Sequence, residues 1–273
     1  MVSKKEDKSA GQELEEKLLM KPKVLGETDN GLLGEAMEYG EEYKEFLKHK
    51  TEREILDYSL PIAKENGYTE FVLGTKYKAG DKVFFNNRDK NLILMTFGKR
   101  PVIEGVRISV AHVDSPRLDF KPNPLFESTD MAYFKTHYYG GIKKYQWTAI
   151  PLSLHGVVTL ADGKTVKVRV GEDPEDPQFC ITDLLPHLAR DQVSKPGNKM
   201  IDAEQMNILI GSWPFKDDKV SQKVKLNIMN ILFEKYGITE TDFLSAELCA
   251  CPAFQPRDLG FDRSMVAAYG QDD

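Results

Sequence analysis

The sequence predicts an α/β protein into which a β-rich segment has been inserted, and three observations lead to this prediction. Two stretches near the start, 35–48 and 52–65, show helical spacing of their apolar residues. A β-branched run at 106–114 then ends in polar residues, at the end of a strand where α/β sheets place their ligands. From about residue 118 short β-like segments follow one another, and an apolar run that ends in acidic residues returns after Pro256.

These changes of pattern divide the chain into four predicted parts. The first is a mobile leader, because its residues are polar and only weakly periodic. Two parts of one α/β domain then flank the β-rich insertion. We expect the leader at 1–33, the first α/β part at 34–118, the inserted β-rich domain at 119–256, and the start of the second α/β part at 257–273.

The two early helices are predicted from different signals. The stretch 35–48 is amphipathic, since its apolar residues recur at helical spacing. The helix at 52–65 begins with a capping box, because Thr51 can accept from the first-turn amides and Glu54 can reach back to the amide of Thr51. An Asn-Gly pair then ends this helix.

Alternation of apolar and polar residues predicts the strands. The segments 82–87 and 91–97 form a hairpin across turn-forming residues, and 106–114 is a third strand. In the insertion, Asp162 and Gly163 are a strong hairpin turn signal. We further expect strands at 131–139, 147–160, 164–172 and 246–254, and helices at 181–191 and 218–236.

Composition excludes several classes of protein. The chain has a formal net charge of -6, which disfavours a general nucleic-acid binder because Lys and Arg hold most phosphate contacts. No run reaches the roughly 18 apolar residues of a membrane helix, and the charged N-terminus lacks the apolar core of a secretory signal. Three cysteines argue against a disulfide framework, and we expect Cys249 and Cys251 to be half-buried strand residues. A cytoplasmic protein is therefore expected.

The segment around His112 carries the clearest chemical signal. His112 lies at the end of a predicted strand, and Asp114 would project to the same side in an extended chain. A metal-bound histidine normally donates its second ring N–H to an acceptor, and Asp114 suits that part. Taken alone, the pattern is a weak signal, because a strand-end histidine beside a surface aspartate occurs by chance in many proteins.

Two other segments carry weaker signals. Near the end of the sequence, an apolar stretch leads into Gly270, Asp272 and Asp273, where a carboxylate could coordinate one metal ion or bridge two. A charged loop is the simpler explanation of the same residues. At 138–147 a Gly-Gly pair lies among aromatic residues and lysines, which suits a substrate loop, a subunit contact or a tight turn with packed aromatics.

Several longer motifs follow one another in order. They are AHVDSPRLDFKPNPL, THYYGGIKKYQW, VGEDPEDP, DLLPHLARDQ and RDLGFDRSMVAAYGQDD. In the order, spacing and residues of these motifs, this chain resembles the aspartyl aminopeptidase family of di-zinc metallo-aminopeptidases. The resemblance extends from about residue 35 onward, and it is strongest to the bacterial branch of the family. The resemblance implies a zinc-exopeptidase α/β domain with an inserted β-rich dimerisation domain. It also implies two zinc ions, peptide substrates that lose an N-terminal, often acidic, residue, and homo-oligomers built from dimers and often dodecameric.

The resemblance also implies roles for individual residues. His112 matches the first zinc ligand, Asp114 the catalytic aspartate that orients and polarises it, and Asp272 the carboxylate that bridges the two metals, with Asp273 ranked second. His187 is the candidate that the inserted domain lends to the substrate pocket of a partner subunit. The general base of the family matches no residue of this chain, so we expect residues 1–273 alone to be inactive and to bind zinc weakly.

Two other functions stay open at this point. One is a non-catalytic oligomerisation or regulatory protein derived from the family. The other is a different metal hydrolase that shares the fold, such as an amidase. The metal is also open, since cobalt or manganese can occupy similar sites built from nitrogen and oxygen ligands.

Overall fold

The computed structural model describes residues 8–20 and 30–270. The chain forms two compact units, Met1–Tyr43 and Lys44–Asp273. In the first unit, helix α1 (Ala10–Leu18) begins with a capping box between Ser9 and Gln12. Helix α3 (Asn30–Phe46) contains most of the helix predicted at 35–48 and begins five residues earlier. Helix α1 and the start of α3 therefore fall within the range expected to be a leader.

Helix α4 (Glu52–Glu65) forms where the sequence predicts it. The amide of Glu54 donates to Thr51 Oγ1 at 3.3 Å, as expected for a helix cap. The predicted hydrogen bond from the amide of Thr51 to Glu54 is wrong, because Glu54 Oε2 accepts from the amide of Lys50 instead, at 2.8 Å. The other oxygen of Glu54 lies 2.7 Å from His155 Nδ1, so this carboxylate is turned toward the six-stranded sheet.

A small sheet follows α4. Strand β1 (Thr69–Glu70) pairs in parallel with β2 (Lys82–Asn87), which pairs antiparallel with β3 (Asn91–Thr96). The predicted hairpin is thus confirmed. Its turn passes through Arg88 and Asp89, whose φ angles of 60° and 56° give the left-handed backbone that tight hairpin turns require.

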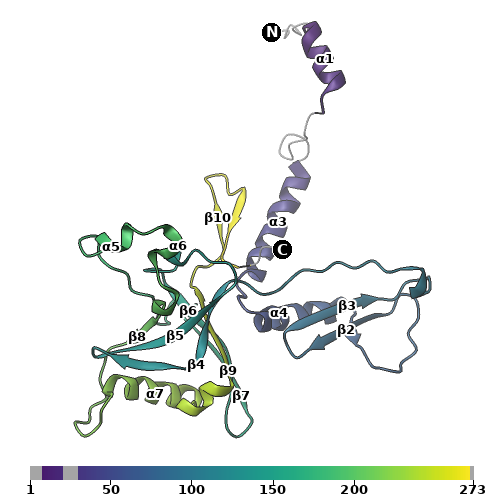
Figure 1. Cartoon of the computed structure of the whole chain (residues 1–273). Helices are drawn as coiled ribbons and strands as arrows, with labels where there is room; N and C mark the ends of the chain where they lie inside the picture. Colours follow the sequence, from purple (N-terminus) through teal and green to yellow (C-terminus); the bar gives the residue numbers. More distant parts are fainter. Residues whose placement is uncertain (1–7, 21–29, 271–273) are drawn as a thin grey trace. The chain divides into compact units, whose positions relative to one another are not determined.

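The largest element is a six-stranded antiparallel sheet with the order β7-β6-β9-β4-β5-β8 (Figure 1). Its strands are β4 (Arg117–Ser128), β5 (Met131–Tyr139), β6 (Leu152–Thr159), β7 (Thr165–Val170), β8 (Ile208–Gly211) and β9 (Ala246–Pro252). The hairpin predicted at Asp162 and Gly163 joins β6 to β7. Gly156 allows the closest approach in the sheet, because its φ is 133° and a Cβ there would collide with the carbonyl of Glu247.

Strand β4 contains two prolines. Pro122 and Pro124 lie inside the strand, which runs from Arg117 to Ser128. Its register with β5 shifts between Phe120 and Leu125, which is where the prolines lie. Proline cannot donate to a ladder, and a bulge removes the need for that donor. The strand therefore continues past both prolines.

One long helix lies on the sheet. Helix α7 (Lys223–Tyr236) packs against β4, β5 and β8, and it ends at Gly237 in a left-handed conformation (Figure 1). It begins five residues after the predicted start at 218. The helix predicted at 181–191 is wrong, because only α5 (Arg190–Val193) is helical there and Pro186 interrupts the preceding residues.

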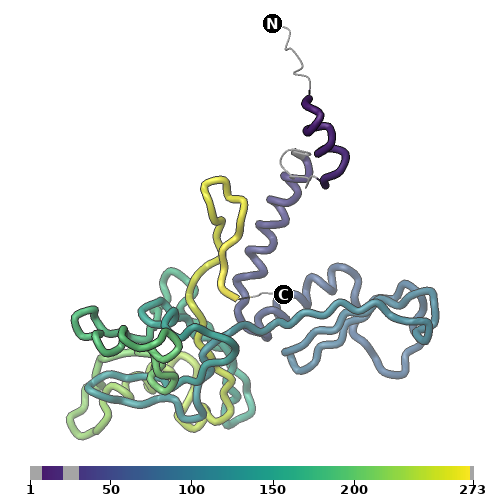
Figure 2. Tube along the Cα trace, turned by 45° about the horizontal axis from the view of Figure 1, so that its top comes forward, coloured from purple at the N-terminus to yellow at the C-terminus, as the bar shows by residue number. Residues whose placement is uncertain are grey.

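The remaining elements are short. A hairpin of β10 (Arg257–Leu259) and β11 (Met265–Ala267) follows the six-stranded sheet and stands out as a yellow loop in Figure 2. The other short helices are η1 (Val102–Glu104), η2 (Lys144–Gln146), α6 (Gly197–Met200), η3 (Ala203–Gln205) and η4 (Glu240–Ser245). Across the described residues, every helix is too short or too polar to cross a lipid bilayer.

The core lies in the six-stranded sheet and beneath α7. Its fully buried members include Leu118, Leu152, Val158 and Ala250. Cys249 and Cys251 are buried rather than half-buried, since both lie in β9 at the centre of the sheet. A hydrogen bond to Cys251, together with burial, raises the pKa of the Cys249 thiol, which disfavours a thiolate pair.

A buried ionic cluster joins the start of α4 to this sheet. Lys50 Nζ lies 2.6 Å from Glu172 Oε1, and both side chains are fully buried. The same ammonium donates to the carbonyl of Pro252 in β9 at 2.6 Å. His155 of β6 contacts both carboxylates of the cluster, with Nδ1 2.7 Å from Glu54 and Nε2 3.1 Å from Glu172. Two cations and two anions are thus paired inside the protein.

The cluster shifts the pKa values of its members in opposite directions. Burial alone would lower the pKa of His155, but the hydrogen bonds to Glu172 and Glu54 outweigh it and raise that pKa to about 9. Burial alone would raise the pKa of Glu172, but His155, Lys50 and Ser153 outweigh it and lower that pKa to about 2. His155 and Glu172 therefore both favour their charged forms at neutral pH.

The stability of the protein is expected to depend on pH through this cluster. The raised pKa of His155 contributes stability that is complete below its ordinary value of 6.5 and is lost as the pH rises through about 9. The lowered pKa of Glu172 contributes stability that is complete above 4.5 and is lost as the pH falls toward about 2. The free energy of unfolding, measured with denaturant, should therefore be constant between pH 4.5 and 6.5. It should fall by about 3 kcal/mol as the pH rises through about 9.

Two variants identify the group responsible. His155→Gln is expected to be less stable than the wild type near pH 6 and to show a much smaller loss between pH 6.5 and 9. His187→Gln removes an exposed histidine and is the matched control. If His155→Gln lost as much stability at alkaline pH as the wild type, groups other than His155 would be responsible for the loss.

Candidate functional site

The chain between the small sheet and β4 forms no strand, which contradicts the strand predicted at 106–114. Figure 2 shows this segment as an extended trace that leads into the six-stranded sheet. Its apolar side chains alternate as predicted, yet Val106, Ile108 and Val110 are 60%, 75% and 85% exposed. A strand needs a hydrogen-bonded neighbour, and none of the described residues pairs with this segment. The predicted alternation is therefore present without the predicted strand.

His112 and Asp114 lie together at the end of this segment. His112 Nδ1 is 2.8 Å from the carbonyl oxygen of Asp114 and 3.2 Å from its Oδ1. Both oxygens are acceptors, so the ring nitrogen between them carries the proton. A histidine with this tautomer coordinates a metal through Nε2. The geometry therefore fits a ligand histidine with an orienting carboxylate.

Asp114 has a second partner that the sequence did not reveal. The hydroxyl of Tyr139, the last residue of β5, donates to Asp114 Oδ2 at 2.5 Å. This hydrogen bond lowers the pKa of Asp114 and raises that of Tyr139. Tyr139 belongs to the Gly-Gly segment, where the only available signal was its position beside a predicted turn.

Two glycines bring the other candidate segments to the same place. A Cβ on Gly140 would lie 3.3 Å from Pro116 Cα, so the Gly-Gly turn touches the segment that contains His112. A Cβ on Gly270, whose φ is 123°, would lie 3.2 Å from Ser115 Oγ. The structure thus brings together three segments that are far apart in the sequence.

The aromatic rings at this place connect the same segments. Tyr269 meets Trp147 edge-on, with ring centroids 5.9 Å apart. Its hydroxyl is buried, and burial raises the pKa of Tyr269 far above its ordinary value. The C-terminal segment is therefore anchored beside the Gly-Gly turn.

The C-terminal segment leads toward the expected metal-bridging residue. Asp272 and Asp273 lie outside the described residues, although Gly270 is already beside Ser115. Within residues 8–20 and 30–270, no three His, Cys, Asp or Glu side chains are close enough to hold a metal ion. The described part of the chain supplies one candidate ligand and the carboxylate that orients it.

His187 belongs to a different segment, residues 181–189. It is exposed in irregular chain before α5. Leu184, Leu185 and Leu188 beside it are 53%, 66% and 69% exposed. An exposed histidine among exposed leucines suits a contact with another protein chain better than a site within this chain.

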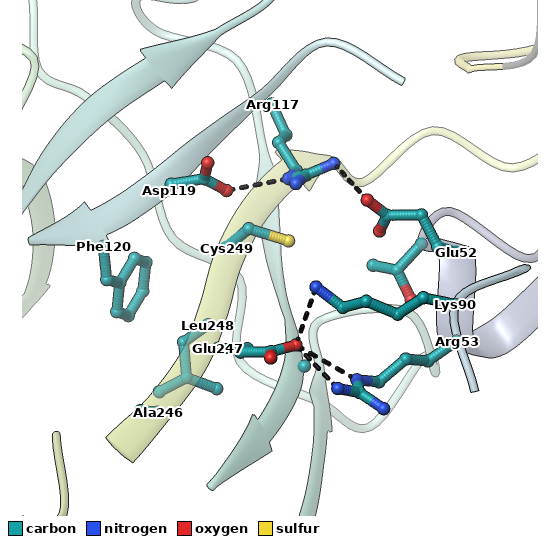
Figure 3. A pocket seen from close by; sticks show the side chains of 12 residues that line it. Glu52, Arg53, Lys90, Arg117, Asp119, Phe120, Ala246, Glu247, Leu248 and Cys249 are labelled. Atoms are coloured by element: carbon teal, nitrogen blue, oxygen red, sulfur yellow. Dashed lines mark hydrogen bonds and ion pairs between the residues drawn. The ribbon is translucent and has the colours of Figure 1, made fainter. Parts of the chain in front are cut away.

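A charged pocket of about 280 Å³ adjoins the site, and the sequence did not predict it (Figure 3). Arg117, the first residue of β4, donates to Asp119 at 2.7 Å and to Glu52 at 3.1 Å. Hydrogen bonding to Asp119 and the charge of Glu52 outweigh burial and raise the pKa of Arg117. Arg53 and Lys90 both contact Glu247, at 2.8 Å and 3.0 Å. Each cation of the pocket is thus matched by a carboxylate.

Comparison with known proteins now gives the family. The model of the aminopeptidase I zinc metalloproteases (M18) matches residues 46–273. A probable M18 family aminopeptidase 1 of Clostridium acetobutylicum is 53% identical over 250 residues, which are 90% of this chain and 54% of the relative. A corresponding protein of Borreliella burgdorferi is 44% identical over 239 residues, which are 87% of this chain and 52% of the relative. The chain spans about half the length of these curated relatives.

Solved structures agree with this assignment. The crystal structure of an M18-family aminopeptidase from Thermotoga maritima matches with a TM-score of 0.86 and 41% identity, over 93% of this chain and 55% of that chain. The structure of a yeast mApe1 dodecamer matches with a TM-score of 0.59, over 84% of this chain and 51% of that chain, and at 15% identity it supports the fold alone. The resemblance to bacterial metallo-aminopeptidases is confirmed, and the chain belongs to the M18 family of aminopeptidase I zinc metalloproteases.

Proposed function

We propose that this chain is part of a zinc aminopeptidase that removes N-terminal residues from peptides. The observation that supports the proposal best is the geometry of His112 and Asp114, in a chain whose bacterial relatives are named as probable aminopeptidases. A zinc-ligating histidine needs an acceptor on its other ring nitrogen, and Asp114 supplies it. No comparable observation favours a non-catalytic protein or an amidase.

His112 would hold zinc through Nε2, and Asp114 would keep the proton on Nδ1. Asp272 would supply the carboxylate that bridges two zinc ions. When bound, zinc lowers the pKa of a coordinated water and polarises the scissile carbonyl group. Asp114 contributes by keeping its negative charge, which the hydrogen bond from Tyr139 favours. The proposal assigns no general base to this chain.

The proposal extends to assembly. We assign the six-stranded sheet to an inserted dimerisation domain at 119–256 and expect homo-oligomers built from dimers. A dodecamer is known for the yeast protein of the same fold. His187 would enter the substrate pocket of a partner subunit, and the exposed leucines beside it support a contact between copies.

Substrate and location complete the proposal. The preferred substrates are peptides with an acidic N-terminal residue, a preference supported by the resemblance to aspartyl aminopeptidases. The location is cytoplasmic, which the three free cysteines support because reducing compartments keep thiols unpaired. A panel of aminoacyl substrates with acidic, neutral and basic residues would test the preference directly.

Removal of the candidate ligand is expected to weaken zinc binding. His112→Ala in the complete gene product should lower zinc affinity at least 100-fold, because a ligand is lost. Asp114→Asn should lower it about 10- to 100-fold, the usual effect of losing the orienting partner. Competition with a chromophoric chelator measures both. His137→Ala removes an exposed histidine from β5 as the control, and unchanged affinity in His112→Ala would refute the proposed metal site.

Residues 1–273 alone are expected to have no aminopeptidase activity. Catalytic zinc normally has three protein ligands, and the described residues bring only His112 to the site. The measurement is hydrolysis of aspartyl, glutamyl and leucyl p-nitroanilides with added zinc. Robust turnover by the 273-residue chain that is lost in His112→Ala would show that this chain completes its own site.

A further inference from the structure

Tyr139 and His112 share one carboxylate. Asp114 Oδ2 accepts from the Tyr139 hydroxyl at 2.5 Å, while His112 Nδ1 lies 3.2 Å from Oδ1 and 2.8 Å from the backbone carbonyl oxygen of Asp114. The two oxygens of a carboxylate are fixed relative to each other. A strong hydrogen bond to one oxygen therefore also fixes the direction in which the other oxygen faces.

Arg117 fixes the ring of Tyr139. The two residues are paired across β4 and β5, and the guanidinium carbon lies 4.4 Å from the centre of the ring. Arg117 is itself held by Asp119 and by Glu52 at the start of α4, as Figure 3 shows. A guanidinium with two carboxylate partners has little freedom, so the ring stacked on it is also restrained.

The backbone reinforces the same contact. Gly140 follows Tyr139 directly and packs on Pro116, two residues after Asp114. The segment that carries His112 is thus tied to the end of β5 through Pro116 as well as through Asp114. The hydrogen bond from Tyr139 therefore links the direction of the Asp114 carboxylate to the end of β5.

We propose that Tyr139 is a positioning residue that holds Asp114 in the orientation at which His112 keeps its proton on Nδ1 and presents Nε2 to the metal. The identity of the metal rests on the proposed function, whereas the contact of Tyr139 with Asp114 and the tautomer of His112 do not. Arg117 restrains the ring of Tyr139, and the hydroxyl of Tyr139 holds the carboxylate of Asp114.

The first test is the tautomer of His112 in the metal-free 273-residue chain. Nitrogen-15 NMR of the histidine rings reports which nitrogen is protonated, and His112→Ala assigns the signal among five histidines. The wild type is expected to carry the proton on Nδ1. In Tyr139→Phe, which keeps the ring over Arg117, the population should shift toward the form protonated on Nε2.

The second test is zinc affinity in the complete gene product, measured without substrate. Tyr139→Phe is expected to weaken zinc binding about 10-fold. Mutation of a residue that hydrogen-bonds a metal ligand usually costs about 10- to 100-fold in affinity, and Tyr139 acts one contact further out. Tyr133→Phe is the matched control. It removes a hydroxyl from the same strand, and among the described residues that hydroxyl makes a 3.5 Å contact with Met131 Sδ. Thermal unfolding of each variant shows whether the fold is retained.

A double-mutant cycle separates positioning from general stabilisation. Once Asp114→Asn has removed the acceptor, Tyr139→Phe should have little further effect on zinc affinity, since the two residues act through one contact. Fully additive losses would contradict the proposal. If Tyr139→Phe unfolded the protein, incorporation of 3-fluorotyrosine at position 139 retains the shape and strengthens the donor, and it should increase the Nδ1-protonated population.

The outcomes distinguish this proposal from the proposed function. Unchanged tautomer and unchanged zinc affinity in Tyr139→Phe would overturn the role of Tyr139, while a loss of zinc in His112→Ala would still support the metal site. A shifted tautomer in Tyr139→Phe, with zinc affinity unaffected by His112→Ala, would support the positioning contact and refute the metal site.

Discussion

The carboxylate of Glu172 has no exposure to solvent, and the protein must neutralise it. Lys50, Ser153 and His155 all contact one of its oxygens, and Gln255 contacts the other at 2.5 Å. These partners come from the start of α4, from β6 and from the chain after β9. An uncompensated buried charge is strongly destabilising, so α4, β6 and β9 must remain together. The position of α4 against the sheet depends on this constraint.

The candidate site depends on the same helix through a second set of charges. Glu52 begins α4 and contacts Arg117, which stacks on the ring of Tyr139. Tyr139 in turn donates to Asp114 beside His112. The chain of contacts from α4 to His112 thus passes through the first residue of β4 and the last residue of β5. A site whose parts come from so many elements can be precise only if the helix and the sheet are fixed relative to each other.

The position of His112 depends on contacts with the end of β5. The segment that carries it has no strand partner among the described residues, and its valines and isoleucine are largely exposed. His112 and Asp114 are nevertheless held in a ligand-like geometry, because Asp114 and Pro116 are fastened to the end of β5.

Much of this protein could be predicted from local patterns in its sequence. The capping residue Thr51 located α4, the Asp-Gly pair located the turn between β6 and β7, and the His-x-Asp pattern located the candidate ligand and its acceptor, because each depends on residues that are close in the chain. Tertiary structure alone decided the rest. Whether residues 106–114 form a strand depends on a distant neighbour, whether Pro122 and Pro124 end β4 depends on a bulge against β5, and the contacts of Tyr139 with Asp114 and of Lys50 with Glu172 join residues 25 and 122 positions apart. Such pairings are invisible to local periodicity, since only the folded chain brings the two partners together.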